Sequence, residues 1–186
     1  MKSIGQLVEE TISVADRGLP EFAFYNACEA LNQTAQMIYK DEELVEPAFQ
    51  KFIRDNWRLI SFMGFGGMEF PENLPFTLRR SVAALNMPFL AQEVVIYAVR
   101  HTLSTHQMPL GVGIAHVGHL RIENDKLLFP KNFLFAILGS VILNPINKNE
   151  EVADKFWISI WDFKMFISEL WGRIDLAERV MNLYEG

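Results

Sequence analysis

The stretch that decides the fold is the apolar run Phe133-Leu-Phe-Ala-Ile-Leu-Gly-Ser-Val-Ile-Leu143, which contains no charged residue. A helix that crosses a bilayer needs about 20 apolar residues, and this run is much shorter before Asn144-Pro145 ends it. A helix that is apolar on all sides but too short for a membrane belongs in a protein core. We therefore expect Pro130 to introduce a buried core helix that ends near Leu143.

The sequence before this run predicts helices, because apolar residues recur at spacings of three and four. Ser3 is a suitable N-cap for the first helix, and Pro20 suits the first turn of the second. Glycine and proline interrupt the pattern between residues 63 and 75, where we expect a loop. The expected helices cover residues 3–16, 21–39, 47–62, 77–86 and 89–105.

The pattern changes near residue 110, where the chain becomes rich in glycine. Residues 119–123 and 126–129 flank the polar pair Asn124-Asp125, which predicts a β-hairpin with a tight turn. After the core helix, Asn149 can cap a last helical region that reaches Leu183, with a kink at Gly172. We therefore expect a mainly all-α single domain over residues 1–186, a bundle of six to seven helices with a β-hairpin inserted near residues 114–129.

Composition is typical of a globular protein of a reducing compartment. Half of the 186 residues are apolar and 22% are charged, which excludes a wholly disordered chain. The single cysteine, Cys28, cannot form an internal disulfide. The first residues lack the apolar core of a signal peptide and become acidic at Glu9-Glu10. We expect a cytoplasmic protein that does not span a membrane.

The formal net charge of −6 is distributed unevenly along the chain. Residues 1–75 hold 6 basic and 12 acidic residues, residues 76–131 hold 6 and 3, and residues 132–186 hold 5 and 8. The overall acidity argues against a protein that coats nucleic acid, and no DNA binding is expected. The locally basic region over residues 76–131 suits one anionic ligand, and Arg79 and Arg80 are candidate anion-binding residues. The alternative is that so small an excess of basic residues arises by chance.

The same basic third holds all four histidines, which are His101, His106, His116 and His119. On a helix the first two diverge by about 140°, and on a strand the last two point to opposite faces. The histidines therefore form no preformed metal site. The alternative interpretation is that they are scattered polar residues in a loop and at a helix end. Nucleotide-binding loops and paired zinc-type cysteines are also absent, so neither a cofactor nor a metal is expected.

The segment Arg100-His-Thr-Leu-Ser-Thr-His106 resembles the Arg-x(4–6)-His signature of the HEPN superfamily, in which a polar residue often follows the arginine. HEPN domains are helical and often dimeric, and many are metal-independent ribonucleases. The resemblance implies that Arg100 holds a phosphate, that His106 assists proton transfer from an RNA 2′-hydroxyl, and that His101 orients the pair or binds phosphate. It implies an endoribonuclease, or a protein that retains an RNA- or anion-binding site, acting as a homodimer.

The spacing of this motif sets a geometric condition. On a continuous helix Arg100 and His106 lie about 120° apart, so they share a site only if the helix ends near Ser104 or a second subunit completes it. Otherwise Arg100 makes an ordinary surface ion pair and His106 ends the helix.

The sequence is also consistent with two other functions. The chain holds 15 Phe, 4 Trp and 4 Tyr residues, and aromatic side chains exposed between Trp157 and Trp171 would indicate a non-enzymatic interaction or dimerisation protein. A small-ligand pocket between helices, lined by Phe and Met and closed by the loop over residues 64–75, is the third hypothesis.

Overall fold

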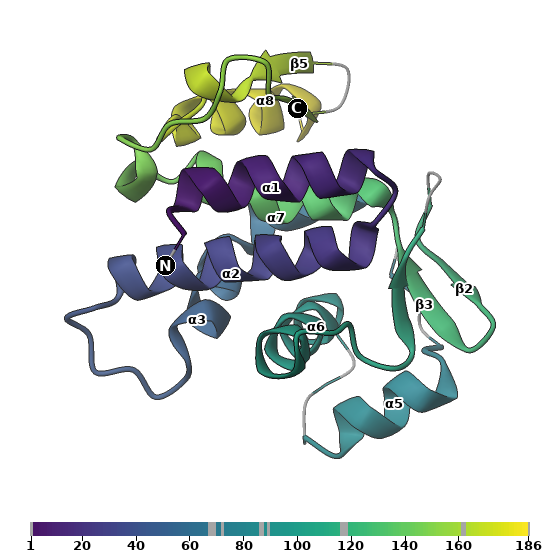
Figure 1. Ribbon diagram of the computed structural model, residues 1–186. Helices are drawn as coiled ribbons and strands as arrows, with labels where there is room; N and C mark the ends of the chain where they lie inside the picture. Colours follow the sequence, from purple (N-terminus) through teal and green to yellow (C-terminus); the bar gives the residue numbers. More distant parts are fainter. Residues whose placement is uncertain are drawn as a thin grey trace.

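The fold is that of a computed structural model, which describes residues 2–66, 70–71, 73–85, 88, 90–115, 119–160 and 163–185. Over these residues the chain is mainly helical, with eight α-helices and two small sheets (Figure 1). The helices are α1 (Ile4–Asp16), α2 (Pro20–Ile38), α3 (Ala48–Asp55), α4 (Trp57–Phe65), α5 (Phe76–Ala83), α6 (Ala91–Thr105), α7 (Lys131–Ile142) and α8 (Ile174–Glu185). The strands are β1 (Val112–Ile114), β2 (Arg121–Glu123), β3 (Lys126–Phe129), β4 (Trp157–Ile160) and β5 (Phe163–Phe166).

The apolar run forms α7, which packs against α2 and α4 in the middle of the molecule (Figure 1). All but three of its twelve residues are buried. The ring of Phe133 stacks on that of Phe129 with 4.4 Å between centroids, and on that of Phe65 with 5.5 Å. The prediction of a buried core helix is confirmed. None of the described helices combines the length and apolarity that a bilayer crossing requires.

Helices α4 and α7 approach closely because each carries a glycine at the contact. A Cβ atom on Gly64 would lie 3.2 Å from the Ala136 Cβ atom, and one on Gly139 would lie 2.6 Å from the Met63 Cε atom. A larger residue at Gly64 would press on Ala136 and Phe133, whereas one at Gly139 would require the flexible end of the Met63 side chain to move.

The helix expected over residues 47–62 is two helices, α3 and α4, which meet at Asn56. Asn56 has φ −103° and ψ 12°, and its side-chain amide donates to the Phe52 carbonyl oxygen. A side chain that bonds to the backbone competes with the regular helix pattern, which explains the interruption. This division brings the described α-helices to eight, against the expected six to seven.

The predicted β-hairpin is present as β2 and β3, which pair antiparallel around Asn124 and Asp125. These two residues have φ values of 50° and 57°, as the tight turns of hairpins require. The structure adds β1, which pairs parallel with β3 and makes a three-stranded sheet with the order β1-β3-β2. A parallel partner leaves no turn signal in the sequence, so this strand was not predicted.

The expected continuous helical region over residues 149–183 is wrong. Strands β4 and β5 form an antiparallel hairpin there, in which Trp157 pairs with Phe166 and Ile158 with Met165. The residues before and at the start of this hairpin alternate, with Phe156 buried, Trp157 exposed and Ile158 buried, which is the period of a strand. Gly172 is no kink within a helix, because it adopts φ 73° and precedes α8.

Candidate functional site

Arg100 and His101 line a shallow pocket of about 290 Å³ between α5 and α6. The residues that α6 contributes are Tyr97, Arg100, His101 and Ser104, which follow the spacing i, i+3, i+4 and i+7. This spacing places them on one stripe of the helix. The opposite face of α6 is buried in the core, so the sequence of α6 directs this polar stripe outward.

Helix α5 forms the other wall of the pocket. It contributes Ser81, and Leu85 follows directly after its C-cap, Ala84. Leu78 and Val82 of α5 are buried, which holds the helix against the rest of the molecule. The pocket is thus formed where two helices that follow each other in the sequence pack together.

Arg100 provides the main positive charge of the pocket. Its side chain is exposed and makes no ion pair with any residue that the structure describes, so the expected surface ion pair is not found there. His101 is partly exposed, and its ring lies 6.1 Å from that of Tyr97. The Ser104 hydroxyl donates to the Arg100 carbonyl oxygen at 2.9 Å, and the Ser81 hydroxyl donates to that of Thr77 at 3.0 Å. Both serine hydroxyls thus donate to backbone oxygens, which leaves the Arg100 guanidinium and the His101 ring among the groups of the lining that can donate to an anion.

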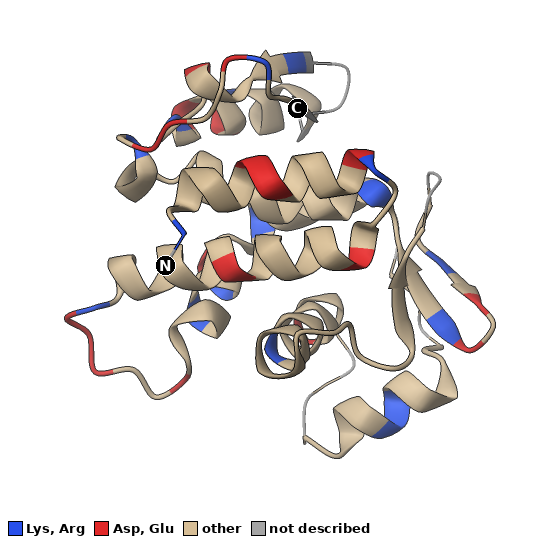
Figure 2. Ribbon diagram, viewed as in Figure 1, with Lys and Arg blue, Asp and Glu red and all other residues tan. Residues whose placement is uncertain are grey.

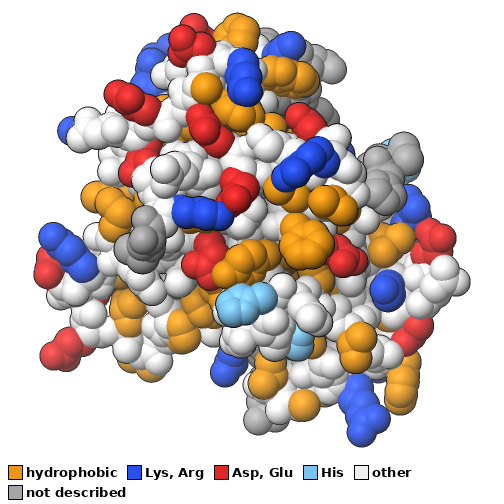
Figure 3. All heavy atoms as spheres, in the orientation of Figure 1, with side chains coloured by type: hydrophobic (Ala, Val, Ile, Leu, Met, Phe, Trp, Pro, Cys, Tyr) orange, Lys and Arg blue, Asp and Glu red, His pale blue; other side chains and the backbone are white. Residues whose placement is uncertain are grey.

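His106 lies outside this pocket. Helix α6 continues beyond Ser104 to Thr105, and His106 follows as its C-cap with φ 59°. The His106 ring makes an edge contact with that of Tyr25 on α2, with 5.0 Å between centroids. Figure 3 shows histidine side chains beside apolar ones on this face. Of the three residues in the Arg-x(5)-His motif, the structure places two in one pocket and the third elsewhere.

Arg79 and Arg80 lie on α5 and are exposed, but they do not line the pocket. They add positive charge to the same region of the surface, because α5 carries these two arginines and the neighbouring α6 carries Arg100 (Figure 2). The two helices together hold one acidic residue, Glu93.

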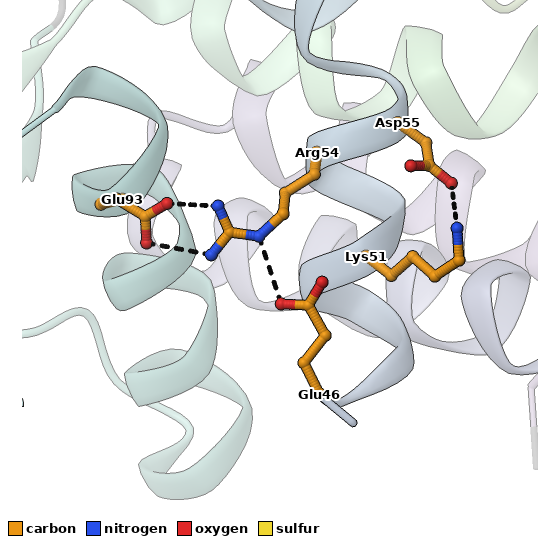
Figure 4. Close-up of polar contacts among 5 residues, drawn as sticks. All are labelled: Glu46, Lys51, Arg54, Asp55 and Glu93. Atoms are coloured by element: carbon orange, nitrogen blue, oxygen red, sulfur yellow. Dashed lines mark hydrogen bonds and ion pairs between the residues drawn. The ribbon is translucent and has the colours of Figure 1, made fainter. Parts of the chain in front are cut away.

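The carboxylate of Glu93 does not oppose the charge of Arg100, because it is buried against α3 on another side of α6. Both of its oxygens accept from the guanidinium of Arg54, which also donates from Nε to Glu46 at 3.2 Å (Figure 4). Beside this group, Lys51 and Tyr39 both donate to Asp55, at 2.8 Å and 2.7 Å. The acidic residue of α6 is thus neutralised within the fold, and the α5–α6 pocket keeps its positive charge.

Of the other two histidines, His119 is not among the residues that line the pocket. His119 is exposed before β2, and His116 lies outside the described residues. Within the described ranges, no three His, Cys, Asp or Glu side chains come close enough together to hold a metal ion.

Exposed aromatic residues do occur in the C-terminal region, on the β4–β5 hairpin. Trp157 is 43% exposed and Phe166 is 47% exposed, and the two are cross-strand partners. The ammonium group of Lys164 lies 3.9 Å from the centroid of the Trp157 ring.

The comparisons with known proteins cover nearly the whole chain. Two relatives, an uncharacterised protein of Mycobacterium tuberculosis and one of Mycobacterium bovis, are each 25% identical to it over 189 residues. Each alignment covers 97% of this chain and 89% of the relative. No solved structure matches the chain. Neither relative carries a HEPN name, so that resemblance rests on the motif alone. The family model described as Rv1289 matches residues 3–185, and the chain therefore belongs to the Rv1289 family.

Proposed function

We propose that this protein binds a phosphate-bearing ligand, in the first place RNA, in the pocket between α5 and α6. The observation that carries the proposal is that Arg100 and His101 share this pocket and no described carboxylate pairs with Arg100. A guanidinium presents a planar fork of donors that matches a phosphate, and a ring N–H of the neighbouring histidine adds a further donor. Exposed Arg79 and Arg80 on α5 would strengthen the attraction at longer range.

The geometry favours binding over cleavage within one chain. Proton transfer to or from a reacting RNA hydroxyl needs a base within hydrogen-bond reach. His106, which the HEPN resemblance assigns to that role, packs against Tyr25 outside the pocket. Cleavage would therefore require the homodimer that the resemblance implies, with a second chain bringing its own His106 to this pocket.

Binding is tested by fluorescence anisotropy with a fluorescein-labelled single-stranded RNA at low salt. Loss of one phosphate contact in the variant Arg100→Gln should weaken the affinity about tenfold and reduce its salt dependence. His101→Asn should weaken it less. The matched control is Arg179→Gln, which removes an exposed arginine from α8 and should bind as the wild type does. Equal affinity of the Arg100 variant and the wild type, or no binding by the wild type, would overturn the proposal.

Cleavage is tested separately by incubating the same RNA with the protein in the presence of EDTA. Intact RNA is expected with both the wild type and His106→Ala. Chelator-resistant cleavage that disappears in His106→Ala would show instead that the chain is a ribonuclease.

A second candidate function is homodimerisation, which the exposed cross-strand pair Trp157 and Phe166 favours. Large exposed aromatic side chains are enriched at protein interfaces. Light scattering after gel filtration should give the mass of a dimer for the wild type and of a monomer for Phe166→Ser. A monomeric wild type would contradict this candidate and leave the RNA-binding proposal untouched.

A further inference from the structure

A second and larger cavity lies away from the α5–α6 pocket. Its volume is about 660 Å³, within the range of sites that enclose small organic molecules. Four elements that are distant in sequence form it: the last turns of α1, the end of α4, the first turn of α7 and the start of β4. Its lining includes Met63, Phe135 and Phe156, as in the sequence hypothesis of a pocket lined by Phe and Met, but no described residue of the loop over residues 64–75 is part of it.

The inner wall of the cavity is apolar. Ile12, Met63 and Ile158 line it, and each is less than 9% exposed. The side chain of Trp157, which is 43% exposed, forms part of the same lining. A hydrocarbon chain or an aromatic ring that binds against this apolar wall and the half-exposed indole is removed from water, which makes its binding free energy more favourable.

Two lysines give the cavity positive charge. The ammonium group of Lys131 lies 6.0 Å from the centroid of the Phe135 ring, and that of Lys155 lies 5.2 Å from the centroid of the Phe156 ring. Neither lysine forms an ion pair with a residue in the described ranges. Contact with an aromatic face replaces a counter-ion only in part, so both charges remain available to an anion.

One carboxylate, that of Asp16, also lines the cavity. The two ammonium groups outnumber this one carboxylate, so the formal charge of the lining is +1. Lys131 is also the first residue of α7, so its ammonium group lies near the positive end of a twelve-residue helix. Charge and apolar surface thus occur together in one cavity that is open to solvent.

We propose that this cavity binds a small amphiphilic anion, a hydrocarbon chain or aromatic ring that carries one carboxylate or sulfonate group. The apolar part of the ligand contacts Ile12, Met63 and Ile158, and its anionic group contacts Lys131 and Lys155. This site is independent of the α5–α6 pocket, because the two cavities share no lining residue.

The proposal is tested with anilinonaphthalene sulfonate, an aromatic sulfonate whose fluorescence rises in an apolar site. The full-length protein should bind it saturably, and Lys131→Met or Lys155→Met should each weaken binding about fivefold to tenfold, because one charge contact near a protein surface is lost. Both lysines are solvent-accessible, so these variants keep the fold. Lys40→Met, in the exposed segment after α2, is the matched control and should leave the affinity unchanged.

Two further measurements separate this site from unspecific apolar binding. Decanoate should displace the probe at least about tenfold better than decanol, which has the same chain without a charge. Asp16→Asn should bind the probe more tightly than the wild type, because it removes the one carboxylate of the lining. Unchanged affinity in both lysine variants, or equal competition by decanol and decanoate, would overturn the proposal.

Discussion

Arg54 is the residue that connects α3 with α6, the helix of the candidate RNA site. Its guanidinium binds both oxygens of Glu93 and one oxygen of Glu46 (Figure 4). The Glu93 side chain is 7% exposed, whereas that of Glu46 is 32% exposed. Because water already solvates Glu46, the two carboxylates contribute unequally to stability although they share one partner.

Removal of Glu93 should therefore cost more than removal of Glu46. We expect Glu93→Ala to lower the free energy of unfolding by about 2–3 kcal/mol, because it removes a buried carboxylate that accepts two hydrogen bonds from Arg54 and leaves that guanidinium with Glu46 alone. Glu46→Ala should cost less than about 1 kcal/mol. Urea denaturation of both variants measures the difference. Equal losses would show that burial of Glu93 is not what makes this interaction strong.

At the scale of elements, α5 depends on a residue from a different element for its N-cap. Its own N-cap position is Pro75, whose side chain forms no hydrogen bond. The carboxylate of Asp125, in the turn between β2 and β3, accepts instead from the Phe76 N–H at 2.9 Å and the Thr77 N–H at 3.3 Å. The Thr77 hydroxyl also donates to it, at 2.5 Å. This hydrogen bond from Thr77, with those from the two backbone groups, lowers the pKa of Asp125.

Acidification should loosen this end of α5. Since the pKa of Asp125 is lower in the folded protein, its contribution to stability is complete above the ordinary value of about 3.9 and is lost as the pH falls through the folded value. Titration by NMR should give the Asp125 carboxyl a pKa below 3.9. In the variant Asp125→Asn, the Thr77 amide should exchange its hydrogen faster than in the wild type at neutral pH. Asparagine tolerates the left-handed backbone of this residue, so the variant isolates the charge.

Glu123→Gln is the control for this experiment, since Glu123 pairs with Arg121 on the same strand and bonds to no helix end. It should leave Thr77 exchange unchanged. An Asp125 carboxyl that titrates at or above its ordinary range would refute the capping role.

Local patterns predicted some elements well and failed for others. The spacing of apolar residues predicted α1, α2, α6 and α7, and the Asn124-Asp125 turn predicted β2 and β3, because those signals are contained within each element. The β4–β5 hairpin was missed because Trp157, Ile160, Trp161 and Lys164 also fit a helical spacing of three and four. That spacing concealed the strand alternation of residues 156–158.

At the scale of the whole molecule, the first helix is joined to a segment near the C-terminal end of the chain. The Gly5 N–H donates to the Glu150 carboxylate at 2.8 Å, and Glu9 accepts from the Ala153 N–H at 2.5 Å. A Cβ atom on Gly5 would lie 2.2 Å from the Glu151 carbonyl oxygen. A backbone atom cannot turn away as a flexible side chain can, so this contact requires glycine.

Gly5→Ala should therefore destabilise the protein although alanine favours a helix over glycine by about 1 kcal/mol. Overpacking against the backbone of Glu151 should produce a net loss of about 1–3 kcal/mol in urea denaturation. Hydrogen exchange should also become faster over residues 150–158. Ser13→Ala, on the same helix, is the control and should change stability by less than about 0.5 kcal/mol. A stabilised Gly5→Ala protein would show that the segment moves aside at no cost.

By itself the sequence determined the buried helix α7, the helices α1, α2 and α6 and the Asn124-Asp125 hairpin, because periodicity and turn chemistry act between near neighbours. It also indicated Arg100 and His101 as candidate site residues. Tertiary structure alone decided that Ser81 and Leu85 border Arg100 and His101 in one pocket, that His106 lies outside it, and that β1 pairs with β3. Those features are contacts between separate elements, and their free energy appears only when the chain has packed.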